Sequence, residues 1–154
     1  MGNPFVFFRS PIAISAMLGW IVAQLIKLPI GFLRTKKWDL ALLINAGGMP
    51  SSHSSLMSAV TTAIGLILGW DDPLFIFSLS VTGIVIYDAT GVRRQAGFHA
   101  ERINQILRAI VAEHKIEEAE RAELLEIIGH SPIEAVVGAL LGILIAFVVW
   151  LLMV

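Results

Sequence analysis

The stretch Gly47-Gly48-Met49-Pro50-Ser51-Ser52-His53-Ser54-Ser55 is a polar island in a largely apolar chain, and a long apolar run begins directly after it. This position puts His53 at the start of a predicted membrane helix. There, free backbone N–H groups and the positive end of the helix dipole favour anions, phosphate above all. In the alternative interpretation, Ser51 or Ser52 only caps the helix and His53 is a boundary residue. The polar residues at the ends of the other predicted spans, described below, favour the anion-binding interpretation.

The composition is typical of an integral membrane protein. Hydrophobic residues make up 56% of the 154 residues and charged residues only 15%, which is less charge than a soluble domain of this length carries. We therefore expect a single membrane-embedded domain over residues 1–154, with its first apolar run as a permanent span rather than a cleaved signal. The net charge of −1 gives no indication of a nucleic-acid partner. The absence of cysteine excludes disulfide and thiolate chemistry.

Four apolar runs predict an all-α helical bundle with about four transmembrane helices. The expected spans are 12–33, 53–70, 74–87 and 131–154. Pro29 predicts a break or bend in the first span. The run 40–46 is too short to cross, so we expect a short helix or a re-entrant segment there. Gly65 and Gly69 form a GxxxG pair, a pattern typical of close helix packing.

Residues 98–128 carry most of the remaining charge, and their apolar residues recur with helical periodicity. We expect two soluble or interfacial amphipathic helices there, with a break around residues 114–117. Four spans bring both termini to one side of the membrane, and every Lys and Arg except Arg9 then falls on the other side. The positive-inside rule makes that other side cytoplasmic, in an inner or plasma membrane.

This threading gathers titratable residues from distant parts of the sequence on the cytoplasmic face. They are Lys27, Arg34, His53, Asp88, Arg93, His130 and Glu134. An ionisable group at a span end is costly, so we expect Asp88 to pair with Lys27 or Arg93. The planar guanidinium of Arg93 suits a phosphate; in the alternative, Arg93 and Arg94 anchor the membrane edge.

His130, Glu134, Gly138 and Gly142 lie four residues apart and form one stripe at the start of the last span. A carboxylate one turn from a histidine can hold the ring and leave one nitrogen free as a nucleophile. The glycines would let another helix approach closely. In the alternative interpretation, Ser131 and Glu134 form a capping box. Two histidines in one pocket permit nucleophilic attack on phosphorus by one and protonation of the leaving oxygen by the other. No acidic or histidine cluster looks like a metal cage.

These motifs resemble the phosphatidic acid phosphatase type 2 and vanadium haloperoxidase superfamily. Met49-Pro50-Ser51-Ser52-His53 is similar to its Pro-Ser-Gly-His motif, and residues 129–134 with the two following glycines are similar to its His-x-x-x-Asp motif. Lys27 and Arg34 resemble its Lys-x6-Arg-Pro motif. The chain looks most like the small divergent membrane branch, whose Gly-Gly-Met-Pro-Ser-Ser-His, Asp-x-x-Gly-Val-Arg-Arg and Gly-His-(Thr/Ser)-Pro-x-Glu signatures it contains. The resemblance covers most of residues 27–143.

The resemblance implies a phosphatase without metal or cofactor that acts on a membrane lipid phosphate or diphosphate. His130 would be the nucleophile that forms a phosphohistidine, Glu134 would orient it, and His53 would be the general acid. The expected phosphate-binding residues are Lys27, Arg34, Ser51, Ser52, Arg93 and Arg94, with Asp88 and Gly48 in supporting positions.

The chain also departs from the superfamily pattern. Arg34 is followed by Thr35 instead of Pro, and Glu-Leu-Leu-Glu at 123–126 stands where the superfamily has a Ser-Arg pair. Arg93 or Arg94 would then supply the missing guanidinium. Usual membrane members have six spans, so either a homodimer completes the pocket or the activity is altered or lost. The alternative function is a non-catalytic membrane protein that binds a phosphorylated lipid head group for scaffolding or transport. A haloperoxidase with a soluble substrate fits the membrane location less well.

Overall fold

The computed structural model describes residues 4–43, 47–114, 124 and 129–154, and every regular element within them is helical. Three helices are long and apolar enough to cross a membrane, and a shorter apolar helix accompanies them. The elements are η1 (Pro4–Arg9), α1 (Pro11–Thr35), η2 (Leu40–Leu43), α2 (Ser52–Leu68), α3 (Pro73–Thr90), α4 (Val92–His114) and α5 (Pro132–Met153). The predicted all-α membrane bundle is confirmed.

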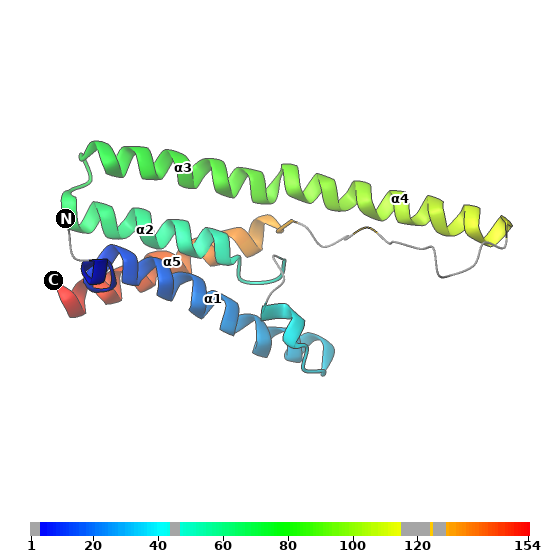
Figure 1. Ribbon diagram of the computed structural model, residues 1–154, viewed down its shortest axis with the longest axis horizontal. Helices are drawn as coiled ribbons and strands as arrows, with labels where there is room; N and C mark the ends of the chain where they lie inside the picture. Colours follow the sequence, from blue (N-terminus) through cyan, green and yellow to red (C-terminus); the bar gives the residue numbers. More distant parts are fainter. Residues whose placement is uncertain (1–3, 44–46, 115–123, 125–128) are drawn as a thin grey trace.

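The helices α1, α2, α3 and α5 lie side by side as one bundle, and both termini lie at the same end of it (Figure 1). Helix α2 is central, because it packs against α1, α3 and α5. At the other end of the bundle, α1 and α3 finish while α2 and α5 begin (Figure 1). We call this the site end. The expected threading therefore holds, and α2 and α5 run parallel to each other.

Helix α2 carries a line of buried hydroxyl side chains that its neighbours satisfy. The Ser55 hydroxyl donates to the carbonyl oxygen of Gly19 on α1 at 2.8 Å, and the hydroxyls of Thr61 and Thr82 pair at 2.8 Å between α2 and α3. Polar side chains inside a membrane bundle hold helices together in this way. Hydrogen bonds as well as apolar contacts therefore fix the central helix.

Two glycines allow α5 to lie directly against the backbone of α2. A Cβ at Gly138 would overlap the carbonyl oxygen of Ser51, and a Cβ at Gly142 would overlap that of Ser55. Only glycine permits backbones to approach so closely. The predicted role of the α5 glycines in helix packing is confirmed, and it places the starts of α2 and α5 next to each other.

The GxxxG pair of α2 has a different role from the predicted one. Gly69 lies beyond the last residue of α2, with a φ of 113° that favours glycine. A Cβ at Gly65 would overlap the ring of Trp70, in the turn toward α3. The pair thus shapes the end of α2 and its turn, because the helix stops before Gly69 could face a second helix.

The first span and the segment after it differ in one respect from the expectation. Helix α1 is continuous through Pro29, so the helix does not break there. The Pro29 side chain is exposed on the outer face, where its ring needs no space in the packed interior. The short element predicted over 40–46 is the 3-10 helix η2 as far as Leu43, and residues 44–46 lie outside the described residues.

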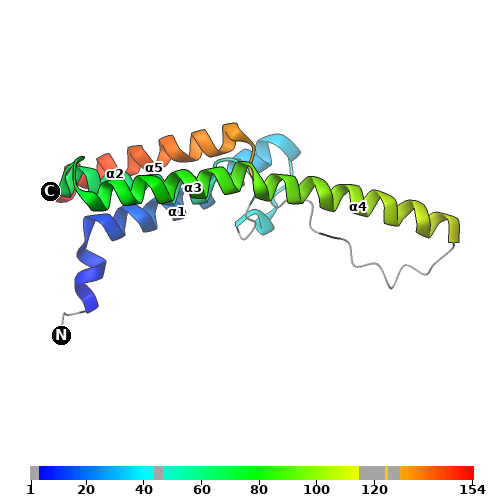
Figure 2. The ribbon, with the colours of Figure 1, turned by 90° about the horizontal axis from the view of Figure 1, so that it is seen from above.

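Helix α4 leaves the bundle at the site end and continues nearly in line with α3 (Figures 1 and 2). It begins at Val92, earlier than the predicted amphipathic region, and it ends at His114, where the break was expected. The predicted second helix lies outside the described residues except for Leu124. The buried side-chain amide of Asn104 donates to the Leu124 carbonyl at 2.9 Å and accepts from the Leu124 N–H at 3.0 Å, which ties the returning chain to α4.

Candidate functional site

The polar loop and the start of the last span meet at the site end. The backbone N–H of Ser51 donates to the carbonyl oxygen of Glu134 at 3.0 Å, so the first turns of α2 and α5 are joined directly. Because these helices run parallel, the positive ends of both dipoles point to the same place. This arrangement favours an anion such as phosphate in front of the two helix starts.

His53 and His130 meet at this point, as the sequence predicted. Their ring centroids lie 6.2 Å apart and the ring planes are inclined by 60°. His53 is exposed, whereas His130 retains only 3% of its exposure. The pair therefore presents a buried imidazole and a solvent-accessible imidazole side by side at the site end.

Glu134 both contacts the His130 ring and caps α5, the two roles that the sequence left open. Its Oε2 lies 3.4 Å from Nδ1 of His130 and also accepts a hydrogen bond from the Ser131 N–H at 3.0 Å. The Ser131 hydroxyl in turn accepts from the Glu134 N–H at 3.3 Å, which completes a capping box. The carboxylate is thus held by the helix cap while it faces the histidine.

The other ring nitrogen of His130 is chemically available. Nε2 is buried, and within the described residues it has no hydrogen-bond partner. With the Nδ1 proton directed at Glu134, Nε2 carries the lone pair. Burial lowers the pKa of His130 below its usual 6.5, while the hydrogen bond and charge of Glu134 raise it in part. The lowered pKa favours the neutral imidazole, and in the tautomer with its proton on Nδ1 the buried Nε2 is the unprotonated nitrogen.

The junction of α3 and α4 holds His130 in place. The backbone N–H of His130 donates to the Ala89 carbonyl at 3.0 Å, and a Cβ at Gly129 would overlap the backbone of Arg94. Sequence reasoning missed Gly129 as a contact residue, although its position directly before His130 was a usable signal. The segment before α5 is therefore packed against the start of α4.

Arg94 is the arginine that shares a cavity with His130. This cavity of about 440 Å³ is lined by Arg94, Phe98, Glu101, His130 and Glu134 together with the glycines and serine between them. The Arg94 guanidinium lies 5.3 Å from the centre of the Phe98 ring, a cation–π distance that limits its freedom. Phe98 and Glu101 were not predicted as site residues, because one helical turn on an amphipathic face gave no distinguishing signal.

Arg93 and Asp88 form an ion pair, which is one of the two pairings that the sequence left open for Asp88. Arg93 Nε donates to Asp88 Oδ2 across Gly91, and both side chains are substantially exposed. The charges of both residues act on His53. The pair thus contributes to the electrostatic field of the site but does not line the cavity beside His130.

Lys27 is buried on α1 and acts electrostatically on the site residues. It is only 2% exposed, and its charge acts on His53, His130 and Glu134. Arg34 lies two turns further along α1, and within the described residues its guanidinium approaches the Met49 sulfur at 4.0 Å. The sequence grouped Lys27 and Arg34 as one phosphate-binding pair, whereas the structure connects only Lys27 electrostatically with the histidines.

The polar loop before α2 contributes a helix cap, a buried serine and a glycine with a positive φ. The Ser51 hydroxyl accepts from the Ser54 N–H at 3.3 Å and lies 3.1 Å from the Ser54 hydroxyl, so the capping alternative holds for Ser51. Ser52 is buried beside it at 1% exposure. Gly48 adopts a φ of 91°, which explains why glycine is needed there.

In the part of the chain that the structure describes, no three His, Cys, Asp or Glu residues gather as a metal site.

The fold and the meeting of the two histidines define an all-α membrane protein with a candidate site at one end of its bundle. The chain matches the family model described as the Divergent PAP2 family over residues 8–145, and it belongs to this family. The resemblance seen in the sequence motifs is thereby confirmed. Family membership points to a phosphatase-like superfamily.

A curated relative covers nearly the whole chain. The Bacillus subtilis (strain 168) protein named uncharacterized membrane protein YuiD is 41% identical over 143 residues, which is 88% of this chain and 90% of the relative. No solved structure matches the chain. The relative supports assignment as a membrane protein.

Proposed function

We propose that this protein is a metal-independent phosphatase that hydrolyses a lipid phosphate or diphosphate through a phosphohistidine at the cytoplasmic membrane face. One observation carries the proposal. The buried Nε2 of His130 has no partner within the described residues, and the His53 ring lies beside it at two converging helix starts. A nucleophile, a general acid and a positive electrostatic field are therefore combined at one point.

In the first step, the Nε2 lone pair of His130 attacks phosphorus while the P–O bond to the lipid breaks. The imidazolium form of His53 gives its proton to the departing oxygen, so the lipid leaves as an alcohol or as a lipid with one phosphate fewer. The two helix N-termini, Lys27 and Arg94 stabilise the charge on the equatorial oxygens. Glu134 holds the His130 ring and stabilises the positive charge that the ring acquires.

In the second step, neutral His53 takes a proton from water, and the hydroxide attacks the phosphohistidine. The P–N bond breaks, inorganic phosphate leaves, and His130 returns to its neutral form with Nε2 free. The exposure of His53 supports this role, because water and the departing group must both reach it. The opposite burial of His130 supports a nucleophile that is shielded from competing protonation.

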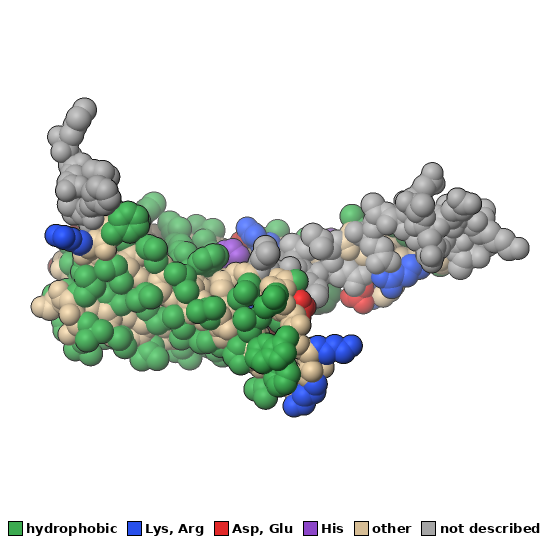
Figure 3. Space-filling model, turned by 60° about the horizontal axis from the view of Figure 1, so that its bottom comes forward, with side chains coloured by type: hydrophobic (Ala, Val, Ile, Leu, Met, Phe, Trp, Pro, Cys, Tyr) green, Lys and Arg blue, Asp and Glu red, His purple; other side chains and the backbone are tan. Residues whose placement is uncertain are grey.

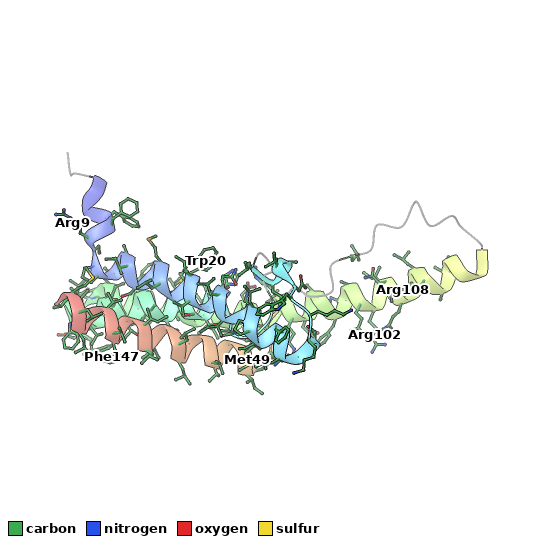
Figure 4. The ribbon with its side chains drawn as sticks, turned by 90° about the horizontal axis from the view of Figure 1, so that it is seen from below. Arg9, Trp20, Met49, Arg102, Arg108 and Phe147 are labelled. Atoms are coloured by element: carbon green, nitrogen blue, oxygen red, sulfur yellow. The ribbon has the colours of Figure 1, made fainter. Side chains whose placement is uncertain are left out.

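The substrate is proposed to be a lipid because the site end adjoins an apolar bundle surface. On the face shown in Figure 3, hydrophobic side chains make up most of the bundle surface, and basic side chains lie at its site end and beyond it on α4. Arg9 lies at the opposite end, near the termini (Figure 4). This distribution supports a cytoplasmic site end by the positive-inside rule.

The test is phosphate release by purified protein in chelator with a panel of lipid phosphates. We expect His130→Ala to reduce the rate at least about a thousandfold and to abolish an acid-labile phosphoenzyme. The matched control is His99→Ala, because His99 is an exposed histidine on α4. Full activity of His130→Ala would exclude this mechanism.

The alternative is a non-catalytic protein that binds a phosphorylated lipid head group for scaffolding or transport. Two observations favour it: the superfamily's Ser-Arg pair is missing at 123–126, and the His130–Glu134 contact is long at 3.4 Å. Tight binding of a lipid phosphate without turnover, unaffected by His130→Ala, would support this alternative.

A further inference from the structure

The cavity beside His130 contains a carboxylate for which the proposed reaction has no role. Glu101 on α4 lines this cavity of about 440 Å³ together with Arg94, His130 and Glu134. Glu134 already contacts the His130 ring and the Ser131 N–H. Glu101 takes part in neither contact, so its position in the cavity needs a separate explanation.

The Glu101 carboxylate is held in place but not neutralised. Its Oε1 accepts a hydrogen bond from the side-chain amide of Gln105 at 3.2 Å, one turn further along α4. Within the described residues this neutral amide is its only polar partner, and the Glu101 side chain is exposed. The second carboxylate oxygen can therefore accept a hydrogen bond from a ligand.

Three cavity residues lie on one face of α4 in the order cation, aromatic ring, carboxylate. Arg94, Phe98 and Glu101 are separated by four and three residues, the spacing of neighbours on one helix face. The Arg94 guanidinium lies 5.3 Å from the centre of the Phe98 ring, and Gly129 packs against the Arg94 backbone. From Arg94 to Glu101 the helix rises about 10 Å. The cavity wall is therefore dipolar, and its positive end is next to the segment that precedes His130.

A carboxylate at the far end of this wall favours one kind of ligand and disfavours another. It repels a second phosphate group by like charge. It attracts an amine, and it accepts a hydrogen bond from a hydroxyl group. A ligand with one phosphate and, a short spacer away, a hydrogen-bond donor would match both ends of the wall.

We infer that Glu101 determines head-group specificity, because it accepts a hydrogen bond from a hydroxyl or amine that a short spacer separates from the phosphate beside His130 and Arg94. This inference rests on the proposed function for the position of the phosphate. It favours a monophosphate over a diphosphate, whose second phosphate would face the carboxylate. Hydroxyl and amine groups share the donor chemistry, and the test separates them.

Three phosphonates of equal chain length are the probes, because their C–P bond resists hydrolysis. Binding of propylphosphonate, 3-hydroxypropylphosphonate and 3-aminopropylphosphonate to the full chain in detergent and chelator is measured by isothermal titration calorimetry. We expect the hydroxyl or the amine compound to bind about tenfold more tightly than propylphosphonate, as one hydrogen bond to a charged acceptor allows. The compound with the higher affinity identifies the donor. Equal affinity for all three, or binding of none, would overturn the inference.

Two substitutions test whether Glu101 produces the preference. Glu101→Ala removes the acceptor, so we expect it to bind all three phosphonates with equal affinity. Glu101→Gln keeps a carbonyl acceptor but loses the charge, so a preference for the amine should disappear and a preference for the hydroxyl should persist in weaker form. A preference that survives Glu101→Ala would refute the role of Glu101.

The control is Asp71→Asn, which removes one negative charge from an exposed side chain at the opposite end of the bundle. We expect this variant to keep the wild-type preference. If it loses the preference to the same extent as Glu101→Ala, net charge rather than a contact with Glu101 causes the preference, and the inference fails.

Phosphate release from the panel of lipid phosphates distinguishes failure of this inference from failure of the phosphatase. A donor preference that disappears in Glu101→Ala supports the inference even if the wild type hydrolyses no lipid. Lipid hydrolysis that depends on His130, together with equal affinities for the three phosphonates, supports the phosphatase and refutes the role of Glu101.

Discussion

The start of α5 and the far part of α4 both carry polar side chains, but in different surroundings. At the helix starts, His130 is buried, and backbone contacts hold its position. On α4, side chains such as Arg102 and Arg108 project from a helix that extends beyond the bundle (Figure 4). The comparison teaches that close backbone packing, more than residue type, turns polar side chains into a preorganised site.

The strongest way to break this comparison is to separate the two helix starts. Gly142→Ala would introduce a Cβ that overlaps the Ser55 carbonyl oxygen and approaches the Ala59 nitrogen at 2.9 Å. Because these are backbone atoms, the helices must move apart, and we expect a loss of more than about 2 kcal/mol in unfolding free energy. Denaturant titration in detergent micelles measures this loss.

The control is Gly83→Ala on α3. Gly83 is exposed, and a Cβ there would meet nothing within 4 Å. Alanine has the higher helix propensity, so this variant should be unchanged or more stable by up to about 1 kcal/mol. If the two variants have equal stability, the contact between α2 and α5 is not what fixes the site.

A second prediction separates the two roles of Glu134. Glu134→Gln keeps a side chain that can complete the capping box but removes the charge that faces His130. We expect the rate of the proposed phosphatase reaction to fall about tenfold or more while the thermal midpoint changes little. Asp71→Asn, at the opposite end of the bundle, is the control for loss of one negative charge. An equal loss of stability and rate would mean that Glu134 acts only as a cap.

The pH dependence of stability tests the surroundings of His130. Burial lowers the pKa of His130 in the folded chain below 6.5, so the unfolded chain binds more protons in the interval between the two values. The stabilisation is complete above pH 6.5 and is lost as the pH falls through the folded value. We expect the thermal midpoint of wild type to fall more steeply below pH 6.5 than that of His130→Gln. Parallel curves would show that His130 is not desolvated.

Much of this organisation could be predicted from the sequence, because it depends on chain topology. Alternating spans bring every second helix start to the same end, so the meeting of His53 and His130 followed from span number alone. The same threading placed Asp88 on one face with Lys27 and Arg93 as its possible partners, and the structure shows the pair with Arg93. The α5 glycines followed from their four-residue spacing.

Other features could not be predicted because they depend on three-dimensional contacts between elements. The spacing of Lys27 and Arg34 gave one helix face, but only the packing of η2 and the Gly48 loop against α1 shows that Arg34 lines another cavity. Gly65 and Gly69 matched a packing motif, but the helix ends between them. The continuity of α1 through Pro29 could not be predicted from the sequence, because a membrane helix tolerates a proline when its surroundings compensate for the lost hydrogen bond.

The smallest expected effect concerns the ion pair at the α3–α4 junction. Asp88→Asn removes a pair whose side chains are 38% and 52% exposed, and solvent screens such pairs strongly. We expect Asp88→Asn, Arg93→Gln and the double variant to differ from wild type by less than about 1 kcal/mol in unfolding free energy. A double-mutant cycle from denaturant titrations gives the coupling between the two charges.

A small coupling energy between Asp88 and Arg93 would support the view that backbone packing matters more than exposed charges. The same junction also has buried backbone contacts. The hydrogen bond from His130 to Ala89 and the contact of Gly129 with Arg94 hold the junction without help from the ion pair. Gly129→Ala should therefore destabilise the chain more than either charge removal, since its Cβ would overlap backbone atoms. A coupling above about 2 kcal/mol, with a tolerated Gly129→Ala, would reverse this order and make the exposed pair the main brace of the junction.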